Sequence, residues 1–537
     1  MAAAVRLSDL PDDLLRRVLR FAPAREGAAT AVLSRRWRTL WRTSGAVNLA
    51  PRLHGHLESR DGFLRAAEAA LAAAHAGGGN RVTRLTFHVD ASNSYKIYRF
   101  FLSRREGDGS ERDMLAAVLS NPAARRVEEL LVAATDDSRH DPCARATGPI
   151  GGRSYSLSFG ALPSEALRWL HIVNCSHLTA PPPGAAFPHL AAVRLHGCKL
   201  HDLFATQRIV DAAPQLAALH LERCSFGYES GCDRLLGPAI TALVFENCSW
   251  PRNKDNLELD MPMLQYFRYE GDVNDLRRVS LRSPEATGLI RVDLHFTDAY
   301  THRNNNGTRD FFWELVQNFR TTKALRVNLD FWMQHIAIID NGDHDELLGN
   351  FLLCNLECLE LQGCYAPESK DDAVAIANLL HCCPVVSDLR LKVTRSSHVV
   401  TMPSPFQHQL DLDKSIDNFR RRRSRAMCSL RGNGGDDYKD YEVSDIPCLS
   451  EHSFECLQSH LRRVSLQFRM DDQNCFGVQL AKFFAENAMV LEEMLIADGS
   501  HKMCEHMNRK IGRWAANSSK RRNSPTTKHF VVLPLET

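Results

Sequence analysis

The chain has 537 residues, with 66 Lys and Arg against 64 Asp and Glu, 44% hydrophobic residues and 24% charged residues. This composition is typical of a folded globular protein, and the net charge of +2 excludes a global field that would hold the whole chain on nucleic acid or on an anionic membrane. The first twenty residues lack the apolar core of a signal peptide, and no stretch reaches the roughly 18 apolar residues of a membrane span. The sixteen cysteines are therefore expected to be reduced thiols, as in a protein of the nucleus or the cytoplasm.

Residues 5–45 predict three short helices. The first begins near Pro11, because proline suits the first helical turn, and it ends at Pro23. Gly27 falls in the second helix, where glycine costs about 1 kcal/mol relative to alanine. Ser34 can cap the third helix. Three helices of this size cannot cover their own leucines and tryptophans, so the segment is either a cap on the next domain or a surface for a partner.

From about residue 80 onward the sequence is periodic. The frame L-x-x-L-x-L-x-x-C, with other apolar residues allowed at the leucine positions, recurs along the chain, and weaker copies lack the cysteine. Consecutive copies from Leu167 to Leu289 are separated by 23, 26, 24, 24 and 25 residues, within the spacing of leucine-rich repeats. The full frames begin at Leu167, Leu190, Leu216, Ile240 and Leu356, and the weaker ones at Leu264, Leu289, Val386, Leu461 and Leu491.

Each frame predicts one short strand whose alternating apolar residues point inward, followed by a turn in which the cysteine packs as a small hydrophobe. Helices or irregular segments are expected between the strands, for example over 200–213. Because one repeat cannot bury its own apolar edge, neighbouring repeats must stack. The expected fold class is therefore α/β: an N-terminal helical domain and then, over 80–395, a repeat solenoid or horseshoe with a parallel sheet on its concave face.

Several polar stretches interrupt the pattern. Residues 92–113 and 136–152 are expected to be exposed insertions between early, irregular repeats. Residues 396–450 are expected to form a flexible basic and acidic insertion, whose basic run at 420–425 has a nuclear-import signal or a nucleic-acid patch as its alternative interpretations. The tail, 517–537, is polar and basic, although its Phe530 to Leu533 can dock as a last strand.

Both ends of the chain resemble a known family. The run from Leu7 to Leu19, together with the run from Ala31 to Arg38, resembles an F-box. Residues 451–516, especially 461–464 and 484–494, are similar to an FBD region. With the repeats between them, these segments resemble plant F-box proteins with leucine-rich repeats and a C-terminal FBD region.

The resemblance implies a substrate-recognition subunit of an SCF-type ubiquitin ligase, in which the F-box docks on a Skp-family adaptor and, through it, on cullin and RING subunits. Such a subunit presents a target protein for ubiquitination, catalyses nothing itself and needs no cofactor. The alternative is a leucine-rich-repeat interaction scaffold with a vestigial F-box and no role in degradation. By similarity, the adaptor-facing residues are Leu10, Pro11, Leu14, Leu15, Val18, Leu19, Val32, Trp37 and Leu40.

The target would be bound by side chains that point out of the sheet. If the residues at frame positions +3 and +5 face inward, those at +2, +4 and +6 face outward. This outward set is rich in His, Arg, Tyr and acidic residues, which suits a polar protein surface, and the alternative for any one of them is a merely solvated sheet face. The candidates are Trp169, His171, Val173, Arg194, His196, His220, Glu222, Val244, Glu246, Tyr266, Arg268, Glu270, Arg291, Asp293, His295, Glu360 and Gln362.

Enzyme and metal sites are not expected. The sequence lacks the nucleophile elbow G-x-S-x-G, the phosphate-binding loop G-x-x-x-x-G-K-[ST] and the zinc-binding H-E-x-x-H helix. Its His and Cys groups do not have the spacing of a closed four-ligand zinc site, so no metal is expected. The groups considered are His196 with Cys198 and His201, His501 with Cys504 and His506, and Cys354 with Cys358, Cys382 and Cys383.

Overall fold

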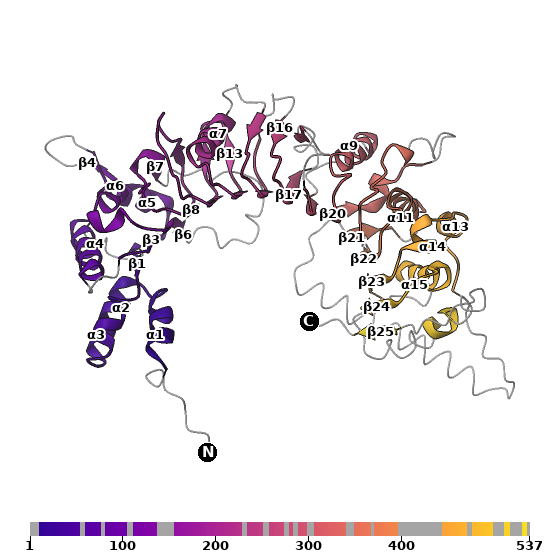
Figure 1. Ribbon diagram of the computed structural model, residues 1–537, viewed down its shortest axis with the longest axis horizontal. Helices are drawn as coiled ribbons and strands as arrows, with labels where there is room; N and C mark the ends of the chain where they lie inside the picture. The colour runs from indigo at the N-terminus through magenta and orange to yellow at the C-terminus, as the bar shows by residue number, and fades with distance from the viewer. Residues whose placement is uncertain are drawn as a thin grey trace, which may run out of the picture. The chain divides into compact units, whose positions relative to one another are not determined.

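The structure of the chain is a computed structural model, and it falls into two compact units (Figure 1). The first unit comprises Met1–Gly271 and Arg278–Thr287, and the second comprises Asp272–Arg277 and Gly288–Thr537. The structure describes residues 10–53, 60–76, 81–104, 111–136, 155–227, 234–250, 257–272, 279–282, 288–297, 305–339, 348–366, 370–395, 443–469, 475–497, 510–515 and 529–533.

The first unit begins with the predicted short helices, α1 (Asp12–Leu19), α2 (Ala24–Ala29) and α3 (Trp37–Leu40), with a 3₁₀ turn at Thr30–Val32. The second helix contains Gly27, as predicted. Arg36 joins the first and third helices, because its guanidinium lies 2.6 Å from Asp12 Oδ1 and donates to the carbonyl of Leu10.

The ring of Trp41 packs so closely against Gly27 that α2 has no room for a larger residue at this position. A Cβ at this position would lie 2.3 Å from Cδ1 of Trp41, whose side chain is buried. The sequence assigns this glycine only a conformational cost, whereas the packing shows that a larger residue would displace the tryptophan ring.

A parallel sheet follows in the first unit, as predicted. Its spatial order is β1-β3-β6-β8-β10-β12-β15-β17. Register is kept from repeat to repeat: Leu170 pairs with Val193, which pairs with Leu219. The strands are β1 (Ala46–Leu49), β3 (Arg84–Ala91), β6 (Glu129–Asp136), β8 (Trp169–Val173), β10 (Ala192–His196), β12 (Ala218–Glu222), β15 (Ala242–Glu246) and β17 (Tyr266–Asp272), and the short β2 (Arg52–Leu53) pairs with β3.

The segments that join its strands lie over one face of this sheet (Figure 1). The helix expected over 200–213 is α7, and two small parallel sheets lie after the main strands. Leu195 and Leu221, at frame position +5, are fully buried. The covering elements are α4 (Arg60–His75), α6 (Met114–Leu119), α7 (Leu203–Ala212), the sheet β7 (Ser156–Ser158), β9 (His177–Thr179), β11 (Lys199–Leu200) and β13 (Ser225–Phe226), and the sheet β14 (Arg234–Leu236), β16 (Leu257–Asp260) and β18 (Val279–Leu281).

The prediction that 92–113 is an exposed insertion is wrong for the described part of that segment. It contains α5 (Ser94–Phe101) and the hairpin of β4 (Leu102–Arg104) and β5 (Glu111–Asp113). The helix buries Phe100 and Phe101, and Phe101 stacks on Tyr155 with 4.6 Å between ring centroids. The helix is polar on one face and apolar on the other. The average composition of the segment is polar, and so it predicts exposure although one face is buried. The other predicted insertion, 136–152, lies outside the described residues except for Asp136, which ends β6.

The second unit also contains parallel strands, in the order β19-β20-β21-β22-β23-β24-β25. Strands of the weaker frames continue this sheet, since Leu389 pairs with Val464 and Leu466 with Leu391. The last strand forms in the tail, as predicted, where Phe530 pairs with Met494. The strands are β19 (Arg291–Thr297), β20 (Ala324–Trp332), β21 (Cys358–Tyr365), β22 (Asp388–Arg395), β23 (Arg463–Gln467), β24 (Glu493–Ala497) and β25 (His529–Leu533), and the helices are α9 (Asn305–Gln317), α11 (Asp371–Cys382), α13 (Pro447–Ser450), α14 (Glu455–Ser459) and α15 (Phe476–Asn487).

Residues 443–450 correct the boundary of the predicted flexible insertion, the rest of which lies outside the described residues. This segment is packed: Leu449 in α13 is fully buried. The ammonium of Lys482 on α15 donates to the carbonyl of Val443 at 2.8 Å and lies 2.9 Å from Asp445 Oδ1. The segment is therefore held against the C-terminal helices. None of the described helices has the length and apolar character needed to cross a bilayer.

Candidate functional site: an apolar helix surface and a polar sheet face

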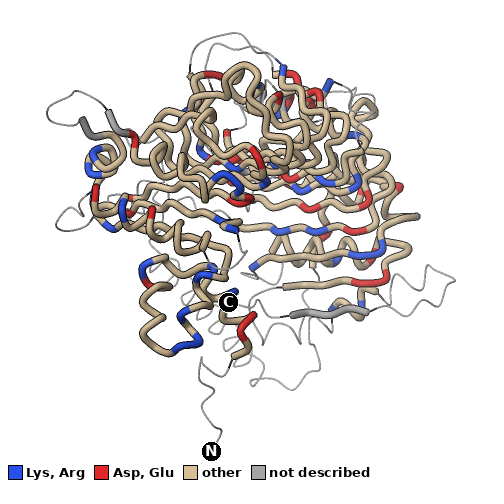
Figure 2. Tube along the Cα trace, turned by 60° about the vertical axis from the view of Figure 1, so that its left-hand side comes forward, with Lys and Arg blue, Asp and Glu red and all other residues tan. Residues whose placement is uncertain are grey.

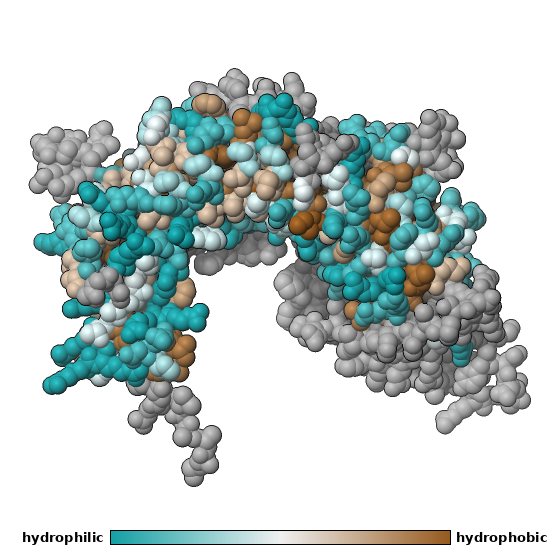
Figure 3. All heavy atoms as spheres, in the orientation of Figure 1, coloured by the Kyte–Doolittle hydropathy of each residue, from teal (hydrophilic) through white to brown (hydrophobic). Residues whose placement is uncertain are grey.

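The N-terminal helices expose large apolar side chains, and Figure 3 shows hydrophobic surface over α1. Leu14, Val18 and Phe21 follow helical spacing along one side of α1 and its C-terminal end, and they are 43%, 49% and 65% exposed. Val32 and Leu33 follow α2 and are 90% and 68% exposed. We call these five residues the apolar surface.

Only part of the predicted adaptor face lies on this surface. Leu14, Val18 and Val32 are exposed, as is Pro11, and Leu10 is half-buried. The prediction missed Phe21 and Leu33, although Phe21 follows Val18 by three residues and so lies on the same helix side.

Four predicted adaptor-facing residues are instead buried within the chain. Leu15, Leu19, Trp37 and Leu40 are at most 3% exposed. The α1 helix has two apolar sides, one carrying Leu15 and Leu19 and the other carrying the apolar surface. Helical spacing groups these residues together and cannot tell which of them the chain covers, so the expectation that these four form a contact surface is corrected.

Polar contacts fasten the helices to the sheet. The side-chain amide of Asn48 on β1 donates to two carbonyls at the end of α1, those of Arg20 and Ala22, each at 2.8 Å. Arg20 also donates to Glu129 Oε1 on β6 at 2.8 Å, and Glu129 Oε2 lies 3.4 Å from the guanidinium of Arg84 on β3. The helices are therefore anchored to three neighbouring strands.

The second candidate site is the outward face of β8 to β17, which we call the polar face. Its residues lie where the frame places them, because residues at the same frame position pair across neighbouring strands. Position +2 gives a row of small residues between two aromatic rings, and positions +4 and +6 give polar rows. The rows are Trp169, Ala192, Ala218, Ala242 and Tyr266; His171, Arg194, His220, Val244 and Arg268; and Val173, His196, Glu222, Glu246 and Glu270.

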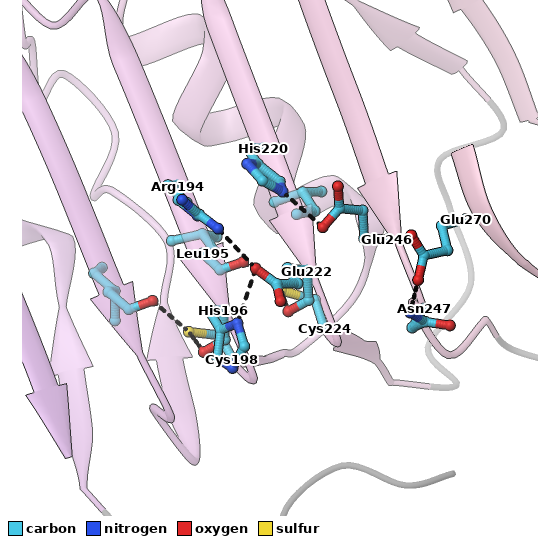
Figure 4. Close-up of polar contacts among 12 residues, drawn as sticks. Arg194, Leu195, His196, Cys198, His220, Glu222, Cys224, Glu246, Asn247 and Glu270 are labelled. Atoms are coloured by element: carbon cyan, nitrogen blue, oxygen red, sulfur yellow. Dashed lines mark hydrogen bonds and ion pairs between the residues drawn. The ribbon is translucent and has the colours of Figure 1, made fainter. Parts of the chain in front are cut away.

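Ion pairs link the two polar rows (Figure 4). Glu222 Oε2 lies 3.0 Å from both Arg194 Nη2 and His196 Nδ1. Glu246 Oε1 lies 3.0 Å from Arg268 Nε, and Glu246 Oε2 lies 3.4 Å from His220 Nε2. Each carboxylate is therefore oriented by a guanidinium from a neighbouring strand.

The charge states of this face follow from burial and from these contacts. Burial raises the pKa of the Glu222 carboxyl, but hydrogen bonds from His196 and Arg194 outweigh it, and the net shift is downward. Burial, followed by the charges of Arg194 and His196, lowers the pKa of His171 to about 4. At neutral pH the carboxylate of Glu222 is ionised and the imidazole of His171 is neutral.

The remaining predicted face residues belong to the second unit, where charges of both signs follow the strands (Figure 2). Arg291 Nε lies 2.9 Å from Asp293 Oδ1 on the same strand. His295 pairs with Asp330 at 3.0 Å. Glu360 pairs with Arg326 at 3.1 Å, and Gln362 is on the same strand, β21.

The frame cysteines of the first unit pack in the turns, as predicted, whereas Cys364 of the frame at Leu356 lies within β21 and is half-buried, so the prediction is wrong for that frame. Cys198, Cys224 and Cys248 are buried, and each thiol donates to a carbonyl of the preceding strand, at 3.5, 3.4 and 3.3 Å. Burial raises the pKa of Cys198 and Cys248, and it raises that of Cys175 to about 12. The thiols of Cys175, Cys198 and Cys248 are therefore protonated at neutral pH and are not nucleophiles.

We therefore expect thiol labelling to separate the cysteines. Cys354 is exposed, so iodoacetamide should modify it rapidly in the native chain. Cys198, Cys224 and Cys248 should remain unmodified until the chain is denatured. Mass spectrometry of peptides from native and denatured samples measures both rates, and equal labelling of Cys198 and Cys354 in the native chain would contradict the packing.

The residue before each frame cysteine of the first unit adopts a left-handed backbone, which the sequence analysis missed. Asn174, Gly197, Arg223 and Asn247 have φ of 61°, 61°, 49° and 51°. The amide of Arg223 donates to the carbonyl of Glu246 on the next strand at 2.7 Å. Asn and Gly at this position in three of the four repeats were the available signal.

Arg223 is the residue for which this conformation is costly. We expect Arg223→Gly to raise the free energy of unfolding by about 1 kcal/mol, because the left-handed conformation costs most residues about 1–2 kcal/mol and glycine loses more backbone entropy on folding. Urea denaturation measures the change. Asn247→Gly is the matched control: asparagine tolerates this conformation, and the hydrogen bond that its side chain donates to Glu270 Oε1 is exposed, so the variant should not be more stable than the wild type. Equal stabilisation at the two positions would contradict the explanation.

Comparisons with known proteins agree with the resemblance seen in the sequence. The F-box domain family matches residues 7–45 and the FBD family matches residues 449–496. An F-box/FBD/LRR-repeat protein from Arabidopsis thaliana is 23% identical over 299 residues, which are 56% of this chain and 62% of the relative. The meiotic F-box protein MOF from Oryza sativa subsp. japonica is 28% identical over 353 residues, 63% of this chain and 62% of the relative.

A further match is shorter but has a higher identity. A putative FBD-associated F-box protein from Arabidopsis thaliana is 54% identical over 46 residues, 9% of this chain and 25% of the relative. The chain spans less than two thirds of the length of each of these relatives. The predicted resemblance to plant F-box proteins with repeats and an FBD region is confirmed.

Proposed function

We propose that this chain is the substrate-recognition subunit of an SCF-type ubiquitin ligase. It combines an F-box with an FBD region, as plant F-box/FBD proteins do. Its F-box would bind a Skp-family adaptor and, through it, cullin and RING subunits. Its sheet would hold the target protein, and the chain itself would be non-catalytic. At the family level, F-box proteins are generally substrate receptors that bind such adaptors.

The observation that carries this proposal is the apolar surface within the segment matched to the F-box. Burying a large apolar side chain fully contributes about 1.5–3 kcal/mol, so a few such residues supply the affinity of a stable complex. Exposed apolar side chains gathered on small helices mark a partner site. The contacts of Asn48 and Glu129 would hold an adaptor bound there in a fixed orientation to the adjoining strands.

The polar face is the surface we propose for the target. We also propose that the stacked parallel strands form a leucine-rich-repeat solenoid of horseshoe type with this face on the concave side. The 23- to 26-residue repeats and the unshifted register from β8 to β17 support this architecture. Action in the nucleus or the cytoplasm is part of the same proposal, because the thiols that carry the fold are reduced.

Co-purification of the full chain with a Skp-family adaptor tests the function. The wild type should retain the adaptor, and Leu14→Asp and Val18→Asp should each weaken binding at least about tenfold, since burying an unpaired carboxylate costs more than the 1.4 kcal/mol that a tenfold change represents. Phe204→Asp, on α7, is the control: this side chain is 51% exposed and lies outside the F-box, so binding should be unchanged.

If the wild type retains no adaptor, the proposed ligase function is wrong. The alternative, an interaction scaffold with a vestigial F-box, would then explain the fold. If the adaptor binds, proteins captured by a chain lacking residues 7–45 should accumulate when the gene is lost. Unchanged levels of all of them would also contradict a role in degradation.

A further inference from the structure

The most unusual cluster on the polar face lies around the side chain of His220. Among the described residues, His220, Glu222 and Glu246 form a group whose ligand atoms all lie within 4.8 Å of one another. Two of them share β12 and the third lies opposite Glu222 on β15. Paired strands hold such residues at a fixed spacing, so the group is assembled without any loop.

His220 Nε2 has no hydrogen bond although it is buried. It points at Glu246 Oε2 but stays 3.4 Å away, longer than an ordinary N–H···O hydrogen bond. Two ligand atoms of one tetrahedral zinc ion are about 3.4 Å apart, because each lies about 2.0–2.2 Å from the metal. The 3.4 Å between His220 Nε2 and Glu246 Oε2 therefore matches the spacing of two ligands of one ion.

The surrounding side chains orient the carboxylates from outside. Arg194 and His196 both contact Glu222 Oε2, and Arg268 contacts Glu246 Oε1. These contacts leave Glu246 Oε2 facing His220. On Glu222 they leave Oε1 as the oxygen that can bind a metal. Such outer contacts fix the direction of metal ligands, while the two guanidinium charges lower the affinity for a cation.

We propose that His220, Glu222 and Glu246 bind a zinc ion, with the fourth position open to water or to a group on a partner. One imidazole and two carboxylates suit Zn²⁺, whereas Mg²⁺ and Ca²⁺ take mainly oxygen ligands. The buried frame cysteines take no part, because their thiols donate to carbonyls of the neighbouring repeat and lie in the turns. The ion would add two positive charges to the polar face. This site is independent of the proposed ligase function.

Zinc chloride titrated into the full chain, in a non-thiol reductant and against a chromophoric chelator, tests the site. The wild type should bind one more equivalent of zinc than His220→Gln and Glu246→Gln. His295→Gln is the matched control, because His295 also faces outward from a strand and pairs with a carboxylate, Asp330. It should bind as many equivalents as the wild type.

Cobalt substitution identifies the ligands of that extra equivalent. It should give the intense visible bands of a tetrahedral ion without thiolate charge transfer, and both variants should lose them. The proposal is wrong if the wild type binds no zinc, or if either variant binds as much zinc as the wild type. It is also wrong if the cobalt bands that the variants lack include thiolate charge transfer, because the ligands would then include a cysteine.

Discussion

Truncating Trp37 to alanine is expected to lower the free energy of unfolding of the N-terminal helices by about 3–5 kcal/mol, the usual cost of removing a buried tryptophan side chain. Trp37 lies in α3 and is 3% exposed. Its ring is therefore part of the interior of the helices and not of the apolar surface. Hydrogen exchange of the amides in α1 to α3 measures the change.

Val32→Asp is the matched comparison, because Val32 is 90% exposed. This variant should leave hydrogen exchange unchanged and weaken adaptor binding, whereas Trp37→Ala should lose adaptor binding only because the helices open. If Trp37→Ala keeps native exchange protection while losing the adaptor, the ring contacts the adaptor directly and the burial described for it does not hold in solution.

Truncating Phe101 to alanine is expected to destabilise the first unit by about 3–5 kcal/mol. Phe101 is 1% exposed and lies between Phe87, at 5.4 Å, and the stacked ring of Tyr155, at 4.6 Å. Such aromatic pairs contribute about 0.5–1.5 kcal/mol beyond the area that they bury. Urea denaturation, followed by fluorescence and circular dichroism, measures the loss.

Tyr95→Ala provides the control on the same helix. Tyr95 is 64% exposed, so its truncation should change stability by no more than about 0.5 kcal/mol. The contrast separates a packed helix from an exposed insertion, in which neither substitution would matter. Equal, small effects at Phe101 and Tyr95 would show that this segment is not part of the core.

Much of the sheet follows from the repeated frame. When apolar residues recur at the same offsets every 23 to 26 residues, they bury together only if neighbouring strands align at the same frame position, as Leu170, Val193 and Leu219 do. The outward placement of the polar rows follows from the same alternation. The early repeats escaped this reasoning because their frames are irregular and because α5 hides its apolar side in a polar stretch.

The candidate sites were predicted less completely. Helical spacing groups the leucines and the valine of α1 on one apolar side, and nothing in the spacing shows that Leu15 and Leu19 face the chain while Leu14 and Val18 face solvent. For the polar face, the frame predicts which side chains point outward, but it does not predict which of them form ion pairs. The group of His220, Glu222 and Glu246 spans two strands that are neighbours only after folding, so no local spacing of ligands reveals it.

The amino-acid sequence by itself determined the strands of the regular frames, the outward rows of their side chains and the resemblance of the two terminal segments, because periodic burial and local motifs depend on spacing along one chain. Tertiary structure alone decided which leucines of the first helix are interior, why Gly27 admits no side chain beside Trp41, and which carboxylates meet His220. These features depend on distances between segments that are far apart in sequence. Such distances are set only when the side chains of all the elements pack together in one interior.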